Sequence, residues 1–303
     1  NAADVRALLR TRLLLTDAEL DRVERHQPAG ARATVEPKLQ WLRVRLDLDA
    51  AQLRKILLTH APLLRRSVES MESNCDWLQR RLGLDEAHLR KMILRNPSLL
   101  WFSVEDNLAP TLDWLQTRLD TDDAELKKMV LTLPPLLSYS VGDKLAPKLE
   151  WLQKRLDLDA AQLRKVVGCP SVLSTRIDTL ESKLEWLQTR LGLDAAQLKK
   201  VVLGTPLLSL SVEENLAPKL EFLAREIGLS CAELRDWVVK NPTLLGYSLA
   251  NRYRPRLEAC RAAGVDAKRV LSYATQTDEI FCEKIGIAPE ALEALRKQSV
   301  LSV

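Results

Sequence analysis

Pairs of adjacent basic residues recur at regular intervals along this 303-residue chain. The pairs are Arg54–Lys55, Arg90–Lys91, Lys127–Lys128, Arg164–Lys165 and Lys199–Lys200. Lys and Arg bind phosphates and carboxylates, so a repeated pair could contact a polyanion once in every unit. Because adjacent helical residues point about 100° apart, at most one residue of each pair can lie in a common row. A solvated outer face is the simpler interpretation.

A second basic series accompanies a tryptophan. Lys148, Trp151 and Arg155 are spaced i, i+3, i+7, and the same triplet recurs at 38–41–45 and 183–186–190. The favoured interpretation is that Trp packs between neighbouring units beneath the Lys and Arg stems. Stacking of the indole on nucleic-acid bases is the alternative.

A third series surrounds recurring prolines and the start of the helix that follows each of them. Its positions vary from unit to unit, as base reading or base stacking would require, and exposed helix N-termini suit phosphates. For its three aromatic residues, packing between units is an equally open interpretation. The candidate nucleic-acid-binding residues are Arg95, Ser98, Phe102, Pro135, Tyr139, Lys144, Ser171, Arg176, Lys240, Thr243, Tyr247, Arg252, Arg254 and Arg256.

The densest basic cluster lies near the C-terminus. Residues 240–261 contain five basic residues and one acid, Glu258. Arg252, Arg254 and Arg256 are therefore the best candidates for phosphate binding, with Arg261 beside them, and a solvated basic surface is the alternative.

Residue patterns typical of catalysis are missing. His26, His60 and His88 fall in separate units without metal-ligand spacing, and no GxxxxGK[ST], GxGxxG or GxSxG occurs. The five cysteines are far apart, without a CxxC, which favours a reducing compartment over a disulfide framework. The sequence predicts a binding protein rather than an enzyme, with no cofactor and no metal.

The elements that position these residues are two-helix repeats. An aromatic marks each first helix, at Trp41, Trp77, Trp114, Trp151, Trp186 and Phe222, with Ala259 in the last place. The intervals are 36, 37, 37, 35, 36 and 37 residues, which fits a helical-repeat solenoid. Leucines spaced i, i+3, i+7 predict the buried stripe of each first helix. Asn107 and Asn215 are the expected N-caps of two of these helices.

Each second helix is predicted to begin at a capping box and to end before a proline. The boxes pair Asp49 with Gln52, Asp122 with Glu125, Asp159 with Gln162, Asp194 with Gln197, and Ser230 with Glu233. The terminating prolines are Pro28, Pro62, Pro97, Pro134, Pro170, Pro206 and Pro242. A single 3₁₀ turn is expected after each proline.

Composition agrees with a soluble all-α array. Leu supplies most apolar residues, the net charge is +4, and no apolar run approaches the ~20 residues of a membrane span. We expect one domain, with a partial repeat or cap over 1–34, tandem repeats over 35–274 and a C-terminal cap over 275–303. The chain begins at Asn1 rather than Met, which is compatible with removal of a targeting peptide.

The repeat resembles the mitochondrial transcription termination factor (mTERF) family. The pattern P-x-L-L…L-x-P-K-L-x-W-L…L-G-L-D…P carries the resemblance, most specifically in NPTLLGYSLANRYRPRLEAC over 241–260 and in a tail with Asp278, Glu279 and Phe281. It extends from about Val35 to Phe281. The tetratricopeptide pattern is absent.

This resemblance implies a solenoid curved around a concave basic groove that binds double-stranded nucleic acid in mitochondria or plastids. We therefore expect a monomer that binds organellar double-stranded DNA selectively and terminates or regulates transcription. Phe102, Tyr139 and Tyr247 are candidates to stack on bases turned out of the duplex. Organellar RNA, in ribosomal RNA maturation or intron splicing, is the alternative ligand, and a protein-binding scaffold is a third possibility.

Overall fold

The computed structural model describes residues 2–25, 32–169 and 171–301, and all regular structure in these ranges is helical. The predicted all-α helical-repeat class is confirmed. Contacts between backbone atoms divide the chain into two compact units, Asn1–Lys148 and Leu149–Val303. The prediction that the repeats form one domain stays a prediction.

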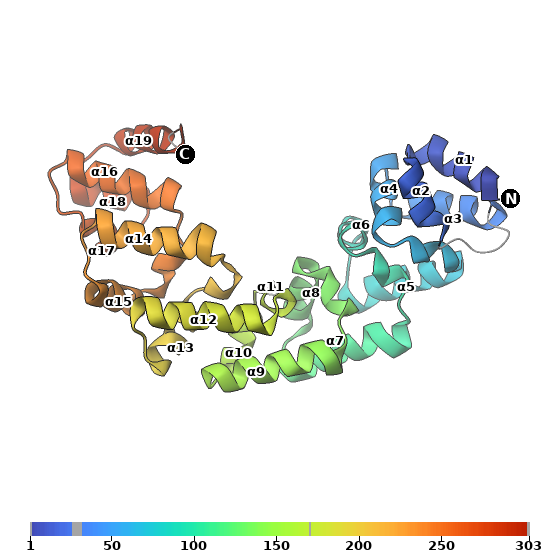
Figure 1. The fold of residues 1–303 in the computed structure, drawn as a ribbon, viewed down its shortest axis with the longest axis horizontal. Helices are drawn as coiled ribbons and strands as arrows, with labels where there is room; N and C mark the ends of the chain where they lie inside the picture. The colour runs from blue at the N-terminus through green and yellow to red at the C-terminus, as the bar shows by residue number, and fades with distance from the viewer. Residues whose placement is uncertain (1, 26–31, 170, 302–303) are drawn as a thin grey trace. The chain divides into compact units, whose positions relative to one another are not determined.

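The first unit contains helical hairpins followed by short turns (Figure 1). Its elements are α1 (Ala2–Leu13), α2 (Asp17–Glu24), α3 (Arg32–Arg45), α4 (Ala50–Thr59), η1 (Ala61–Arg65), α5 (Val68–Leu82), α6 (Glu86–Arg95), η2 (Pro97–Leu100), η3 (Val104–Leu108), α7 (Ala109–Leu119), α8 (Asp123–Thr132), η4 (Pro134–Ser138) and η5 (Val141–Leu145). Helix α9 (Ala146–Leu156) begins at the end of this unit and continues into the second.

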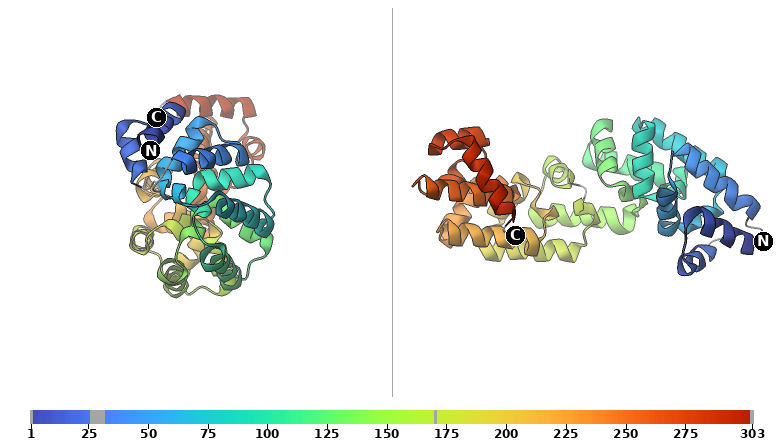
Figure 2. Two further views of the ribbon diagram at one scale, coloured as in Figure 1. Left: turned by 90° about the vertical axis from the view of Figure 1, so that its right-hand side faces the viewer. Right: turned by 90° about the horizontal axis from the view of Figure 1, so that it is seen from above.

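The second unit repeats the plan and ends with additional helices. Its elements after α9 are α10 (Ala160–Val167), α11 (Ser171–Ser174), α12 (Ile177–Leu191), α13 (Ala195–Gly204), η6 (Leu207–Ser209), η7 (Val212–Leu216), α14 (Ala217–Glu226), α15 (Cys231–Lys240), η8 (Pro242–Gly246), η9 (Leu249–Tyr253), α16 (Arg254–Ala262), α17 (Arg269–Ser272), α18 (Asp278–Ile285) and α19 (Pro289–Leu301). The C-terminal α19, red in Figure 2, packs against α16 and α18.

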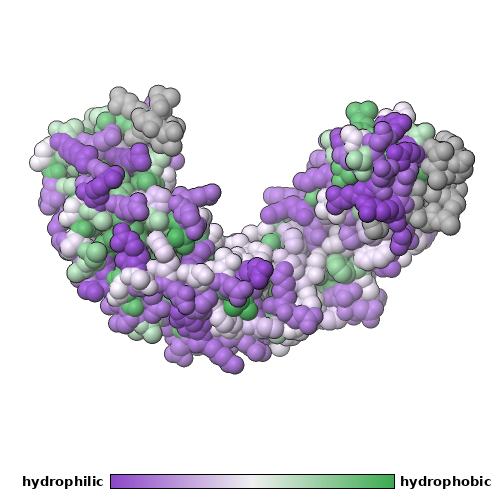
Figure 3. All heavy atoms as spheres, viewed as in Figure 1, coloured by the Kyte–Doolittle hydropathy of each residue, from purple (hydrophilic) through white to green (hydrophobic). Residues whose placement is uncertain are grey.

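The core consists of the predicted leucine stripes. Leu149, Leu152 and Leu156 are all buried on α9, and the equivalent residues are buried on the other first helices. Full burial of one such side chain stabilises the fold by about 1.5–3 kcal/mol. Polar side chains dominate the visible surface of each unit, with small apolar patches between them (Figure 3).

The capping boxes form as predicted at Asp49, Asp159, Asp194 and Ser230, and a further box joins Thr16 to Glu19. Asp122 accepts a hydrogen bond from the N–H of Glu125 at 2.7 Å. Because these side chains satisfy N–H groups that the first helical turn leaves unpaired, they fix where the second helices begin.

Short 3₁₀ helices follow Pro62, Pro97, Pro134, Pro206 and Pro242, as predicted. After α10 the corresponding element is α11, which is a single α-helical turn. Pro28, Pro170 and His26 lie outside the described residues.

The expected N-caps of the first helices are wrong. Ser103 and Ser211 cap these helices, and Asn107 and Asn215 lie inside the turn that follows. The Ser hydroxyls accept the N–H groups of Asp106 at 3.0 Å and Glu214 at 3.1 Å. Each Asn lies four residues after its Ser, inside a π turn of five residues, and the cap is therefore upstream of the position that a regular helix would give it.

Four π turns, η3, η5, η7 and η9, begin first helices that contain a proline. In η3 the N–H of Leu108 bonds to the carbonyl of Ser103 at 3.1 Å, five residues back. Trp114 follows its cap Ser103 by 11 residues, whereas Trp77 follows its cap Ser67 by 10. The π turn therefore accommodates one inserted residue.

Proline accompanies these insertions. The four helices have Pro110, Pro147, Pro218 or Pro255 four residues before the aromatic position, whereas α5 and α12 have Ser73 and Ser182 there and are regular from their first turn. Helix α3 is the exception, because it has Pro37 at this position and is α-helical from Arg32. Proline lacks an N–H and its ring clashes with the carbonyl four residues back. A π turn moves that carbonyl out of the regular α-helical position.

Candidate nucleic-acid interface

The lysines of the first-helix series are buried and support the turns between helices. Lys38 donates to the carbonyl of Leu64 at 2.7 Å, Lys183 to that of Leu208 at 2.8 Å, and Lys219 to that of Leu245 at 2.7 Å. Each acceptor lies in the 3₁₀ turn that follows the second helix of the same repeat. Burial lowers the pKa of these lysines. They are therefore part of the scaffold and not available to phosphates.

The same position is polar and buried in every repeat. Asn74 donates to the carbonyls of Leu99 and Phe102, both at 2.8 Å, and Thr111, Lys148 and Arg256 are also buried. Burial lowers the pKa of Lys148 to about 8, and neighbouring Lys144 contributes. A buried polar side chain three residues before the aromatic is thus a constant feature of the repeat.

The aromatic residue and the Arg four residues after it also connect repeats. Trp41 Nε1 and Arg45 Nε donate to the Glu72 carboxylate, both at 2.6 Å, and Arg155 donates to Glu181 at 2.7 Å. Both acceptors lie on the next first helix. The structure supports packing between neighbouring repeats for this series.

The second-helix pairs divide into two kinds of residue. The first member of each pair is half-buried. Three of these residues donate to the C-terminal end of the first helix in the preceding repeat. Arg90 donates to the carbonyl of Asp47 at 3.2 Å, and Lys127 donates to that of Gly83 at 2.5 Å. Lys199 donates to that of Asp157. A cation at a helix C-terminus is favourable because unpaired carbonyls gather there.

The second members of the pairs are exposed, without a hydrogen bond or ion pair to any described residue. They are Lys55, Lys91, Lys128, Lys165 and Lys200. Helices α4 and α6 pack together in the first unit, and α10, α13 and α15 pack in succession in the second. Equivalent residues on stacked helices form a row within each unit, and we call these five residues the lysine row.

Two predicted residues extend the lysine row by one helical turn. Arg95 is four residues after Lys91, and Lys240 is four residues after Asp236, which replaces the row lysine on α15. Both are exposed, and Arg95 donates to the carbonyl of Leu131 at 3.2 Å. These two residues end their helices directly before a proline turn. The extended lysine row therefore lies next to the proline turns, although the two were separate series in the sequence.

Ser98 belongs to a network between two proline turns. Its hydroxyl donates to Asn96 Oδ1 at 2.7 Å and lies 3.0 Å from the hydroxyl of Ser138. The Asn96 amide donates to the Ser138 hydroxyl at 2.7 Å. These bonds fix η2 against η4, and Ser98 is half-buried between them.

Two predicted aromatic residues each lie beneath a predicted cation. Lys144 Nζ lies 3.4 Å from the centre of the Tyr139 ring, and the Arg252 guanidinium lies 4.3 Å from that of Tyr247. Tyr139 and Tyr247 occupy equivalent places in their repeats, and both cations are carried by π turns, η5 and η9. Phe102 is the equivalent residue before η3, where Asn107 replaces the cation.

Arg256 corrects the phosphate-binding prediction. Its side chain is 0% exposed and donates to the carbonyls of Tyr273 and Gln276 at 2.7 and 2.8 Å and to Asp278 at 2.7 Å. Such a guanidinium is a structural group that closes the C-terminal end of the repeats, and it cannot contact a phosphate on the surface.

The other arginines of that cluster differ from Arg256. Arg252 is half-buried and donates to the carbonyl of Ala274 at 2.7 Å. Arg261 is paired with Glu226 at 3.0 Å. Arg254 is half-buried and has no partner among the described residues. The dense cluster therefore leaves Arg254, and in part Arg252, for an external ligand.

The remaining predicted residues are at least partly accessible. Lys240, Thr243 and Arg176 are exposed, and Arg176 is paired with Asp178 at 3.2 Å. Pro135 and Ser171 are half-buried. The sequence shows the lysines of the row, but a solvated outer face was the simpler interpretation, so none of them was among the predicted binding residues. The signal for it is that the second residue of each pair stays Lys, while the first alternates between Arg and Lys.

In the described part of the chain, no group of three or more His, Cys, Asp or Glu residues is arranged to hold a metal ion. His88 is a cap contact, with Nδ1 2.7 Å from Asp85, and His60 packs edge-on against Trp101. None of the described helices combines the length and apolarity needed to span a bilayer.

Comparison with known proteins agrees with the repeat geometry. The family model described as mTERF matches residues 30–190 and 117–281, which together cover most of the chain. No curated protein matches the chain. The π-turn first helices, the proline turns and the family match lead to one conclusion: this chain belongs to the mTERF family of nucleic-acid-binding helical-repeat proteins.

Proposed function

We propose that this protein binds organellar double-stranded DNA selectively and thereby terminates or regulates transcription. The observation that carries the proposal is the lysine row: five second helices each carry one exposed and unpaired ammonium, while the lysines of the first-helix series are buried in internal contacts. A periodic row of free cations is suited to a polymer with regularly spaced phosphates.

The residues beside the row supply contacts that differ between repeats. Arg95, Lys240 and Thr243 are exposed at its edge, and the Tyr139–Lys144 and Tyr247–Arg252 stacks lie where the next helix begins. In this proposal the row positions the duplex through its phosphates, and the variable residues select the sequence. The tyrosines are the candidates to stack on a displaced base, with the cation already placed over the ring.

We also propose a mitochondrial location, with the chloroplast as the alternative, and a monomer as the binding species. Both follow from the family and neither affects the binding experiment, which uses purified protein.

The experiment compares duplex DNA, duplex RNA and single strands in fluorescence anisotropy titrations at several salt concentrations. The variant Lys128→Ala/Lys165→Ala/Lys200→Ala removes three proposed phosphate contacts. Because each lost phosphate contact reduces the slope of log K against log salt by about 1, we expect a slope lower by about 3 and weaker binding to all sequences. Lys154→Ala is the control, an exposed lysine on the first helix α9.

An unchanged slope in the triple variant would remove the row from the interface. Tighter binding to RNA than to duplex DNA at every salt concentration would transfer the function to organellar RNA. Binding to neither would reject both nucleic-acid functions.

A further inference from the structure

The end of α1 differs from the ends of the other first helices. Each first helix is followed by a residue of positive φ, which in the other repeats is Asp or Gly: Asp47, Gly83, Asp120, Asp157, Gly192, Gly228 and Gly264. After α1 it is Leu14, with φ 52°. A branched apolar residue is disfavoured in this conformation. Leu14 is also 77% exposed, the most exposed large apolar side chain described.

A contact that closes the equivalent site in other repeats is also missing here. Arg90, Lys127 and Lys199 each donate to the carbonyl of the positive-φ residue in the preceding repeat. Arg54 occupies the same position on α4, yet its guanidinium donates to Glu19 at 2.7 and 2.8 Å. The site beside Leu14 therefore stays open.

An apolar groove with a basic rim lies beside Leu14, where this contact is missing. It has a volume of about 700 Å³ and runs between the end of α1 and the outer face of α4. Leu13, Leu14, Ala50, Ala51 and Leu58 form its apolar surface. Its charged lining residues are Arg12, Arg54 and Lys55, with no acid among them. Lys55 has no partner among the described residues.

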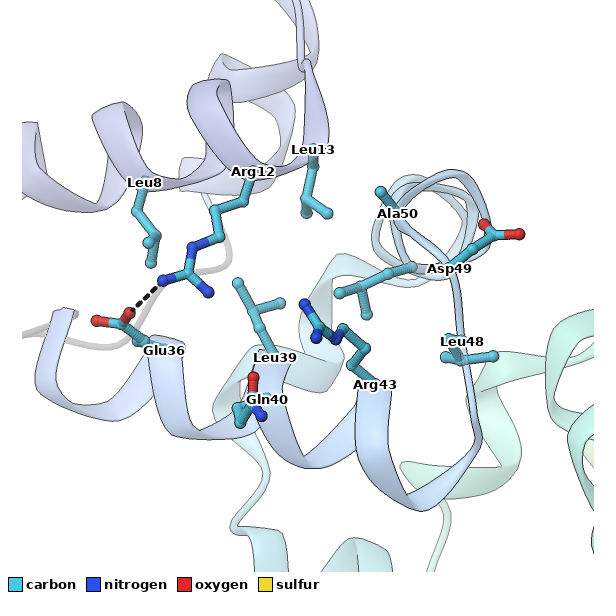
Figure 4. A pocket seen from close by; sticks show the side chains of 11 residues that line it. Leu8, Arg12, Leu13, Glu36, Leu39, Gln40, Arg43, Leu48, Asp49 and Ala50 are labelled. Atoms are coloured by element: carbon cyan, nitrogen blue, oxygen red, sulfur yellow. Dashed lines mark hydrogen bonds and ion pairs between the residues drawn. The ribbon is translucent and has the colours of Figure 1, made fainter.

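A deeper pocket of about 230 Å³ adjoins the groove and shares Arg12, Leu13 and Ala50 with it. In Figure 4, Leu8 and Leu13 from α1 face Leu39 from α3 across this space. Arg12 crosses its edge to reach Glu36 at 3.2 Å. Because an apolar cavity of about 150 Å³ holds benzene, this pocket has room for an aromatic or leucine side chain.

We propose that this groove binds an acidic, amphipathic helix of a partner protein. The helix would place its apolar stripe on Leu14 and Leu58, insert one large side chain into the deeper pocket, and direct carboxylates at Arg12 and Lys55. Helix-in-groove binding depends on such spaced apolar anchors. The apolar floor disfavours nucleic acid. Glu36 and Asp49 line the deeper pocket, but no acid lines the groove around the unpaired Lys55, which favours acidic residues in the part of the ligand that lies there.

The test uses the 303-residue chain and a fluorescein-labelled helical peptide with Leu at i, i+3, i+4 and i+7 and Glu elsewhere. We expect saturable anisotropy. Leu14→Asp, which restores the residue type of other repeats, should weaken binding at least tenfold. Asp tolerates positive φ, so the variant should unfold at the same or a higher temperature than the wild type. Peptides with Lys in place of Glu, or Ser in place of Leu, should bind at least tenfold more weakly.

Lys55→Glu and Lys91→Glu form a matched pair, because both residues belong to the lysine row but only Lys55 lines the groove. Both variants should weaken duplex DNA binding alike, and only Lys55→Glu should weaken peptide binding. This pairing separates failure of the docking site from failure of the proposed function. Leu14→Asp should leave duplex DNA binding unchanged.

Three results would overturn the proposal. They are no saturable binding of the acidic peptide, equal binding by wild type and Leu14→Asp, and a dimer in sedimentation velocity that Leu14→Asp abolishes. The last would assign the groove to a second copy of the chain.

Discussion

Arg256 and Asp278 form an ion pair, with Nη2 2.7 Å from Oδ1, in which the guanidinium is fully buried and the carboxylate is about a third exposed. Phe281 lies against the guanidinium, with its ring centre 4.6 Å away, and Arg296 of α19 donates to the other oxygen of Asp278. This arrangement connects the last first helix, α16, to α18 and α19. An arginine that the sequence places in a basic cluster thus fixes the C-terminal end of the second unit.

Substituting Arg256 should therefore affect stability rather than binding. We expect Arg256→Ala to lower the free energy of unfolding by about 3–5 kcal/mol, because breaking the buried pair leaves two carbonyls without a donor and Asp278 with Arg296 alone. Urea unfolding followed by circular dichroism measures this. Arg254→Ala is the control, which should retain stability and weaken duplex DNA binding. A stable Arg256→Ala variant with weakened binding would restore Arg256 to the interface.

The buried Lys148 should make stability depend on pH. Burial lowers its pKa from the ordinary lysine value of 10.5 to about 8, so between these values the unfolded chain holds a proton that the folded chain has lost. Stability contributed by this residue therefore rises as pH increases from about 8 to 10.5. Burial raises the pKa of Cys75 to about 12, which acts in the opposite direction at high pH, so a difference measurement is needed.

The measurement compares wild type with Lys148→Met in urea unfolding between pH 7 and 10.5. The difference in unfolding free energy should move in favour of the wild type as pH rises. Lys154→Met, at an exposed position of α9, should show no such trend. A pH-independent difference for Lys148→Met would show that Lys148 titrates normally in the folded protein.

The π turn η3 should be removable by two coupled changes. Deletion of Asn107 shortens the segment from Ser103 to Trp114 to the length found in α5, and it brings Leu108 to the place of the buried Met71. Deletion alone forces Pro110 into a regular helix, at a cost of about 3 kcal/mol. Adding Pro110→Ser, which matches Ser73, should recover most of this loss.

A double-mutant cycle in urea measures that coupling. An interaction energy of about 2 kcal/mol or more is expected between the deletion and Pro110→Ser. If the two effects simply add, proline is not the reason for the π turn.

Gly204 is required by a close approach between repeats. A Cβ at this position would lie 2.5 Å from Cβ and Cγ of Pro242. We expect Gly204→Ala to destabilise the protein by about 1–3 kcal/mol, although Ala is the better helix former. Gly142→Ala is the control, since nothing lies within 4 Å of its Cβ position. Equal melting temperatures for the two variants would contradict the close contact.

Much of the fold could be predicted because its signals are local. The aromatic interval, the capping boxes and the terminating prolines each depend on neighbouring residues, and the structure confirms them. The π turns were not predicted, because an insertion of one residue is no larger than the variation already present among the steps of 35, 36 and 37 residues. That insertion also explains why Asn107 and Asn215 were wrong as caps.

The candidate site was harder to predict because the sequence does not show whether a basic residue is exposed or buried. Lys183 and Lys200 are both lysines on amphipathic helices, yet one donates to the carbonyl of Leu208 and the other is exposed. What separates them is the position of carbonyls in the turn after the second helix, which the periodicity of one helix does not report. Arg256 was assigned to the surface for the same reason.

The buried donors give the array a direction. Lys38, Asn74, Lys183 and Lys219 each depend on carbonyls that come later in the chain. Loss of the turn that follows a hairpin leaves a buried donor among apolar side chains, whereas loss of the helix that carries the donor leaves only carbonyls that water can solvate. Within each unit, fraying from the N-terminal side is therefore cheaper than fraying from the C-terminal side. Hydrogen exchange should accordingly be faster in α1 and α2 than in α16 and α18.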